Sequence, residues 1–237
     1  MMPTTDTDAA RLEALIKAEE RALALLDAIE ARQLIAPGRT ERAVEQDIRL
    51  IAERDFGVTK HWHKRVVRAG INTLMTAGDN PPDRAIEADD IVFLDLGPVF
   101  EEWEADVGRS YAVGPDPLKR KLCADLPIVF ERVRAHYLAS PDITGAALYE
   151  IACREAEREG WSFGGKIAGH IVGDFPHAHV PGEKDLQRIA PANPRPLSDP
   201  DSYGRERHWI LEIHLVDRER GFGGFYERLM RGPGSAG

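Results

Sequence analysis

Apolar residues recur at helical spacing in the first quarter of the chain. Residues 6–32 carry apolar positions three or four apart, with Asp6 or Thr7 as the N-cap, and predict one amphipathic helix. After a Pro-Gly break, residues 40–54 predict a second helix that Thr40 can cap. Both patterns are typical of helices that pack on a core and carry no chemistry of their own.

The middle of the chain predicts a β-hairpin of two apolar strands, about Ile91–Val99 and Glu102–Val113. With the turn centred between residues 100 and 101, Asp95 would face Asp106 across the strands. Like charges that face each other destabilise a sheet, and their burial costs more still. The pair therefore indicates a compensating partner, for which a divalent cation is the usual choice.

A second hairpin near the C-terminus poses the same problem. Its strands are expected at His208–Val216 and Gly223–Met230, around a mostly polar turn. A turn centre between residues 219 and 220 places Glu212 opposite Glu227. Exposed or salt-bridged acids would account for one such pair, but two matched pairs in apolar strands favour a metal site.

The second half of the chain repeats the order of the first. Residues 117–138 form a helical pattern with an expected kink or interruption at Pro127, and residues 145–159 form another. Helix, helix, strands and acid hairpin thus occur twice, over about 6–113 and 117–230. This order predicts an α+β fold with a pseudo-two-fold sheet wrapped by helices. One domain would span residues 1–237, with the metal held between the halves.

A histidine-rich stretch separates the two hairpins. Residues 164–182 contain His170, His177 and His179, and small residues surround the first of them. Neutral imidazoles complement carboxylates around a transition metal. A lone histidine in an apolar strand is more often a core residue, but four spare carboxylates in the same chain favour ligation.

Two other regions have roles that the sequence leaves open. His61 and His63 precede a strand-like run at 65–67, and their spacing places them on the same face of an extended chain. Surface or packing roles are the favoured interpretation for both, and contact with a substrate is the alternative. The proline-rich connection at 183–207 can be a lid, a binding loop or a linker.

Composition narrows the class of partner. The formal charge is −9, and no basic stripe offsets the acids, so nucleic acid is excluded as the main partner. No apolar run approaches the length of a membrane span, and no signal peptide is apparent at the N-terminus. Cys123 and Cys153 fit free thiols better than a disulfide scaffold. Together these features predict a cytoplasmic protein without a membrane partner.

At five positions the chain resembles the pita-bread metallopeptidases, the family of methionine aminopeptidase, Xaa-Pro aminopeptidase, prolidase and the non-peptidase creatinase. Members hold their metals with Asp, Asp, His, Glu and Glu in that chain order. The matching residues are Asp95 in FLDLG, Asp106 in EADVGRS, His170 in AGHIVG, Glu212 in ILEIH and Glu227 in FYERL. The resemblance extends over most of the chain and implies the pita-bread fold.

The resemblance also implies a chemistry. Two divalent ions, Mn²⁺ foremost and otherwise Co²⁺, Fe²⁺ or Zn²⁺, would be bridged by Asp106 and Glu227. Glu212 would bind metal and shuttle a proton, and His177 would contact the substrate carbonyl. The implied function is an aminopeptidase or Xaa-Pro-type dipeptidase that cleaves an amide bond near a peptide N-terminus. The partner would be a peptide or small amide substrate, and a homodimer is the oligomer considered.

One departure keeps other functions open. The family peptidases carry a histidine five residues after the asparagine that matches Asn72, and here that position is Ala77. In the family this histidine contacts the scissile amide. Its absence favours, as the alternative, a metal-dependent hydrolase of a small non-peptide amide or amidine, similar to creatinase. A non-catalytic pita-bread binding module is the third hypothesis.

Overall fold

The structure is a computed structural model of the whole chain, and it describes residues 7–176 and 184–231. Four α-helices occur in this part of the chain, in two pairs: α1 (Asp8–Ala31), α2 (Glu41–Phe56), α3 (Pro117–Ala139) and α4 (Gly145–Arg158). The predicted caps form, because the hydroxyls of Thr7 and Thr40 accept hydrogen bonds from Ala10 N and Ala43 N. Helix α3 continues through Pro127 without interruption. None of these helices combines the length and apolar character that crossing a membrane requires.

Antiparallel strands form one large and one small sheet. The large sheet has the order β2-β3-β6-β10-β9-β7, with β8 also paired to β9, and the small sheet has the order β1-β4-β5. The bounds are β1 (Lys60–His61), β2 (Val66–Ala69), β3 (Ile91–Leu96), β4 (Pro98–Phe100), β5 (Trp103–Glu104), β6 (Val107–Ala112), β7 (Ser162–Phe163), β8 (Gly169–Val172), β9 (His208–Asp217) and β10 (Phe222–Leu229). The predicted α+β class is confirmed.

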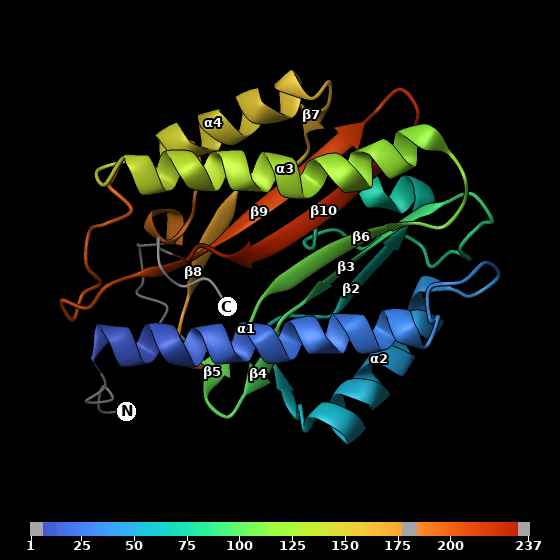
Figure 1. Cartoon of the computed structure of the whole chain (residues 1–237), viewed down its shortest axis with the longest axis horizontal. Helices are drawn as coiled ribbons and strands as arrows, with labels where there is room; N and C mark the ends of the chain where they lie inside the picture. Colours follow the sequence, from blue (N-terminus) through green and yellow to red (C-terminus); the bar gives the residue numbers. More distant parts are fainter. Residues whose placement is uncertain (1–6, 177–183, 232–237) are drawn as a thin grey trace.

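The two helix pairs flank the strands of the large sheet (Figure 1). Apolar side chains of α1 and α2 pack with those of β2, β3 and β6 in one core. Side chains of α3 and α4 pack with those of β9 and β10 in another. Strand β6 of the first half pairs with β10 of the second, so the halves of the chain meet inside one sheet. The expected boundaries of a two-fold repeat, 6–113 and 117–230, remain a prediction.

The register of the second hairpin is the predicted one, whereas that of the first is not. Glu212 faces Glu227 in the β9–β10 ladder, as expected. In the β3–β6 ladder Asp95 faces Gly108, so the predicted opposition of Asp95 and Asp106 is wrong. The turn is centred one residue later than expected, because Glu101 adopts a positive φ of 59° that residues other than glycine rarely take.

Candidate metal centre

One row across the large sheet places three acids on a single face. Asp95 pairs with Gly108, Gly108 pairs with Glu227, and Glu227 pairs with Glu212. Residues directly opposite one another share a face, so the three carboxylates point to the same side. Gly108 leaves the middle of the row without a side chain. A Cβ there would lie 2.6 Å from the Phe225 ring and 3.0 Å from Glu227 Cβ.

Asp106 and His170 complete the set of predicted ligands. Asp106 lies two residues before Gly108, so its side chain emerges on the face of the row. His170 comes from β8 on the other side of the site. Its Nε2 lies 3.1 Å from Asp106 Oδ2, 3.5 Å from Glu212 Oε1 and 3.7 Å from Glu227 Oε1. The structure therefore brings the five residues together from both halves of the chain.

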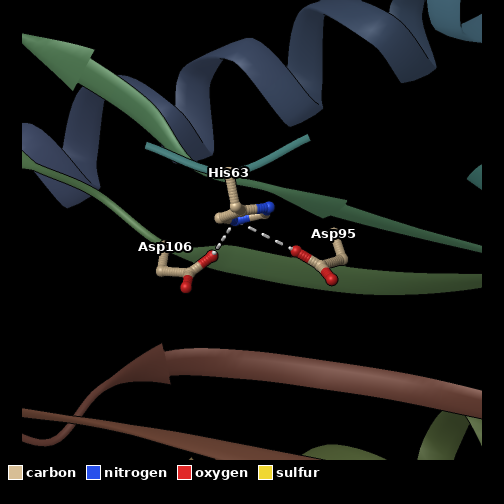
Figure 2. Close-up of side chains that lie close together, drawn as sticks. All are labelled: His63, Asp95 and Asp106. Carbon is tan, nitrogen blue, oxygen red and sulfur yellow. Dashed lines mark hydrogen bonds and ion pairs between the residues drawn. The ribbon is translucent and has the colours of Figure 1, made fainter. Parts of the chain in front are cut away.

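A second histidine faces the same acids. Figure 2 shows His63 between Asp106 and Asp95, with its Nε2 3.1 Å and 3.4 Å from their Oδ1 atoms. His63 lies in the connection between β1 and β2 and contacts the acids, and both the favoured surface or packing role and the alternative of substrate contact stay predictions. The spacing of His61 and His63 was the only sequence signal, and it does not show that the connection crosses the site. His214 also lines the cavity, where its ring Nε2 donates to Thr73 O at 2.8 Å.

Burial and the facing histidines dominate the electrostatics of the acids. Burial raises the pKa of Asp95 to about 6 and that of Glu212 to about 7, and it raises the pKa of Glu227 well above its usual value. Burial also opposes ionisation of Asp106, but the facing histidines outweigh it and lower the pKa of that carboxyl to about 2. Ionising all four acids together is therefore costly unless added positive charge lies among them.

The donor set suits divalent metal ions. Three of the acids are buried and Glu212 is 16% exposed, so water solvates them poorly. Glu227 Oε2 is buried and has no hydrogen-bond partner among the described residues. Carboxylates together with imidazole nitrogens are ligands of Mn²⁺, Fe²⁺, Co²⁺ and Zn²⁺. A buried acceptor without a donor, beside like charges, is the arrangement that a cation relieves.

The acids and histidines open onto a cavity of about 360 Å³. Ala77 lines this cavity, at the position where the resembling peptidases carry a histidine. Lys166 and Arg188 add two cationic side chains to the lining. Arg188 belongs to the proline-rich connection, part of which therefore reaches the site. His177 and His179 lie outside the described residues, so their expected roles stay predictions.

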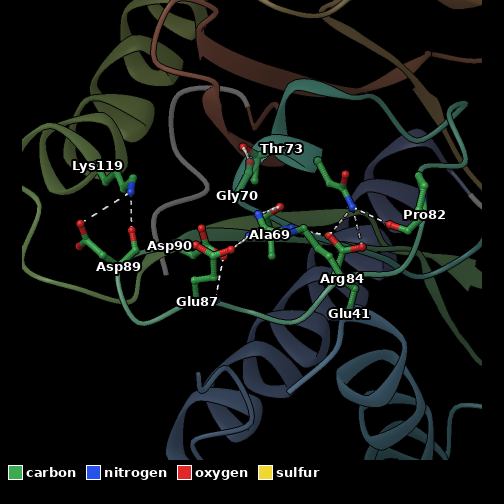
Figure 3. A network of polar contacts seen from close by, with 11 residues as sticks. Glu41, Ala69, Gly70, Thr73, Pro82, Arg84, Glu87, Asp89, Asp90 and Lys119 are labelled. Atoms are coloured by element: carbon green, nitrogen blue, oxygen red, sulfur yellow. Dashed lines mark hydrogen bonds and ion pairs between the residues drawn. The ribbon is translucent and has the colours of Figure 1, made fainter. Parts of the chain in front are cut away.

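A network of polar contacts joins the start of α2 to the segment that follows β2 (Figure 3), and this segment leads into the cavity wall formed by Met75, Thr76 and Ala77. The Glu41 carboxylate at the start of α2 accepts hydrogen bonds from Ala69 N and from Asn72 Nδ2. Asn72 also donates to Pro82 O. Thr73 Oγ1 accepts a hydrogen bond from Gly223 N at 2.7 Å, which ties the wall to β10. The asparagine that marks the family pattern thus has a structural role in this chain.

Comparisons with known proteins agree with this geometry. The sequence profile of metallopeptidase family M24 matches residues 13–199. The chain is 26% identical over 160 residues to an Xaa-Pro dipeptidase of Pyrococcus horikoshii, which covers 67% of this chain and 44% of the relative. It is 28% identical over 153 residues to an Xaa-Pro dipeptidase of Pyrococcus furiosus, covering 63% of this chain and 42% of the relative. The chain thus spans less than half the length of these two curated relatives.

Solved structures show the same fold. An X-Pro aminopeptidase from Thermotoga maritima superposes with a TM-score of 0.69 at 20% identity, covering 91% of this chain and 57% of that chain. A prolidase from Pyrococcus horikoshii gives a TM-score of 0.68 at 20% identity, covering 92% and 58%. The predicted pita-bread fold is confirmed by these superpositions.

Proposed function

The chain belongs to metallopeptidase family M24, and we propose that it is a hydrolase that uses two divalent metal ions to cleave an amide bond near the N-terminus of a peptide. An aminopeptidase or an Xaa-Pro-type dipeptidase is the favoured activity. The observation that carries this proposal is the convergence of four poorly solvated carboxylates and the His170 imidazole on one cavity. Such a cluster is costly to build unless it binds cations.

Asp95, Asp106, His170, Glu212 and Glu227 would hold the metals. Oxygen ligands predominate in this set, which supports Mn²⁺ as the foremost ion and leaves Co²⁺, Fe²⁺ and Zn²⁺ as alternatives. When bound, two divalent ions supply Lewis acidity to the substrate carbonyl and lower the pKa of water in the site. The cytoplasmic location and the homodimer considered for this chain stay predictions.

Glu212 would transfer the proton during hydrolysis. Its carboxylate lines the cavity beside His170, with Oε1 3.5 Å from the His170 Nε2. A carboxylate within reach of a reacting water can act as a general acid–base. Glu212 would accept a proton from the attacking water and deliver it to the leaving amine nitrogen. The predicted role of His177, contact with the substrate carbonyl, completes this assignment.

The cavity supports a short peptide substrate. Lys166 and Arg188 line it together with the acids, so one part of the cavity attracts negative charge. A dipeptide carries its free carboxylate only one residue beyond the scissile amide, within reach of such cations. The curated relatives in Pyrococcus are named Xaa-Pro dipeptidases, which accords with substrates of this length. Amidation of the dipeptide carboxylate should therefore raise KM.

Ala77 supports a second candidate function, namely hydrolysis of a small non-peptide amide or amidine. In place of a histidine, the wall here offers the small apolar side chain of Ala77 beside Met75 and Thr76. Such a wall supplies no imidazole to contact a peptide nitrogen. Ala77→His would therefore raise peptidase activity if the chain is a peptidase, and would leave it undetectable if the substrate is a small amide.

The test combines metal reconstitution with a substrate panel. Metal-free protein would be loaded with Mn²⁺ or Co²⁺ and assayed against Xaa-Pro dipeptides, longer peptides and small amides or amidines. Glu212→Gln should lower kcat about 10²–10⁴-fold, the range that general acid–base groups contribute. Glu219→Gln, in the turn of the same hairpin, is the matched control and should keep full activity. Absence of hydrolysis across the panel with metal bound would favour the binding module.

A further inference from the structure

The imidazole rings of His63 and His170 have the same orientation relative to the acids. Nδ1 of His63 lies 2.6 Å from the backbone oxygen of Lys64, and Nδ1 of His170 lies 2.8 Å from that of Ile171. A carbonyl oxygen can only accept a hydrogen bond, so Nδ1 carries the proton in both rings. This leaves Nε2 of each ring to face the acids. Histidines that bind metals commonly donate their other ring N–H to a backbone carbonyl in this manner.

Asp106 offers one oxygen to each histidine. Its Oδ1 lies 3.1 Å from Nε2 of His63, and its Oδ2 lies 3.1 Å from Nε2 of His170. Asp95 completes the His63 side at 3.4 Å, and Glu227 joins the His170 side at 3.7 Å. Two donor atoms that are each about 2.1 Å from a metal, at angles between tetrahedral and square, are roughly 3.0–3.4 Å apart. The three shorter distances match that spacing.

We propose that His63 is a sixth metal-binding residue, so that each of the two metal positions contains one imidazole. His63, Asp95 and Asp106 would form one position, and the other would combine Asp106 and His170 with the two glutamates. In both, the nitrogen and two carboxylate oxygens lie within 4.8 Å of one another. The inference rests on the proposed metal site and extends it to a residue outside the five-residue pattern.

The position of the His63 ring is built into the fold. Gly97 lies directly under it, and a Cβ at that residue would be 2.3 Å from His63 Cδ2. The Trp62 indole packs edge-on against both imidazoles, with ring centroids 4.5 Å from His63 and 5.0 Å from His170. Trp62 is itself fixed by a hydrogen bond from Nε1 to Ala105 O. One aromatic side chain thus positions both histidines.

An imidazole also changes which ion the first position prefers. A position of carboxylates alone suits Mn²⁺, whereas each imidazole shifts the preference toward Co²⁺ and Zn²⁺. Most sites of either kind bind Co²⁺ more tightly than Mn²⁺, and with His63 as a ligand this difference in affinity should be similarly large at both positions. Replacement of His63 should reduce this preference at one position only.

Calorimetric titration of metal-free protein with Co²⁺ and Mn²⁺ tests the proposal, together with X-ray absorption spectra of the Co²⁺ form. His63→Phe removes the nitrogen donor while it keeps a planar ring. His61→Phe, the same change two residues earlier, is the matched control. We expect two Co²⁺ ions per wild-type chain and a loss of about tenfold or more in the affinity of one of them in the His63 variant. His61→Phe should retain both.

The absorption spectrum of the wild type shows whether His63 binds metal even if His63→Phe does not fold. His63→Gln serves as a second variant. Two histidine ligands for two ions give an average of one imidazole per metal, and one histidine gives one-half. The wild type should show the first value. Two unchanged affinities in both His63 variants, or one-half imidazole per metal, would overturn the role of His63 alone. A wild-type chain that binds no metal would overturn the proposed function as well.

Loss of activity without loss of metal has a different meaning. If His63→Phe keeps both ions and the wild-type spectrum but raises KM, His63 contacts substrate and does not bind metal, which also contradicts the inference. With an average of one imidazole per metal in the wild type, the ligand assignment holds in either of two cases, whatever the enzyme hydrolyses. The variant keeps both ions and its average falls to one-half, or it loses one ion and the remaining ion keeps one imidazole. Metal affinity and substrate affinity thus separate the two roles.

Discussion

The two hairpins of the site hold their acids in different ways. In β9–β10, Glu212 and Glu227 face each other within one unbroken ladder. In β3–β6, Asp95 belongs to the ladder, whereas Asp106 lies just before β6 and reaches the site diagonally. An unbroken ladder places both acids of a pair at one depth. The diagonal arrangement spreads the aspartates along the site, and it lets one of them contact both histidines.

Single replacements of Asp95 and Asp106 should have the largest effects and test how the first hairpin places its acids. Asp106 faces both histidines and Asp95 faces only His63 among the two, so Asp106→Asn should lose both metal ions and Asp95→Asn should lose one. Elemental analysis of each variant, purified without chelator, gives the count, with Glu219→Gln as the control that keeps both. Equal losses in the two aspartate variants would remove the distinction between them.

Metal binding should also stabilise the chain, because its proposed ligands come from both hairpins. A ligand at one hundred times its dissociation constant adds about 2.7 kcal/mol to the free energy of unfolding. We expect added Mn²⁺ or Co²⁺ to raise Tm in the wild type and a chelator to reverse the rise. In a double variant, Asp106→Asn with Glu227→Gln, Tm should not respond. A response that survives in this variant would come from metal bound elsewhere.

Gly108 tests how closely the two hairpins pack, because it lies between them in the row of acids. Gly108→Ala would place a Cβ against the Phe225 ring and Glu227, so it should destabilise the fold by about 1–3 kcal/mol, as overpacking does. Chemical denaturation measures this loss. Gly78→Ala is the matched control, because its Cβ would meet only Thr76 Oγ1, at 3.9 Å. Similar losses of stability in both variants would show that packing at Gly108 is no closer than packing at Gly78.

The smallest effect concerns the link between the first half of the chain and the second hairpin. Thr73→Val removes the hydroxyl that accepts a hydrogen bond from the buried Gly223 N. An unsatisfied buried donor costs about 1 kcal/mol or somewhat more. Denaturation should report this loss, and hydrogen exchange should show faster exchange of the Gly223 amide. Thr76→Val, at a half-exposed position of the same wall, should leave that amide protected.

Sequence reasoning succeeded where local rules act alone. The threonine caps and the helix bounds follow from hydrogen bonds between near neighbours, and the Glu212–Glu227 register follows from a regular ladder around a polar turn. The Asp95–Asp106 register failed because Glu101 takes a left-handed conformation that its residue type does not announce. A single unusual φ angle moved the centre of that hairpin by one residue.

The contact between His63 and the acids was not predicted, for another reason. Its approach to the acids depends on Gly97, which is distant in sequence and leaves room for the ring, and on Trp62, which packs against it. Patterns along the chain describe which face a residue occupies, but they do not describe which other segment lies beneath that face. The pattern of five metal ligands was recognisable because the acids lie on regular strands. The sixth candidate lies in a connection, where periodicity carries no information.

The Thr73 contacts have a consequence for how the cavity recognises its ligands. The carbonyl of Thr73 accepts from His214 in β9, and its hydroxyl accepts from Gly223 at β10, so the wall that contains Ala77 is attached to the sheet at two points. A wall fixed during folding needs little further ordering when a ligand arrives, which lowers the entropic cost of binding. On this side we therefore expect the cavity to select its ligands by a shape that exists before binding.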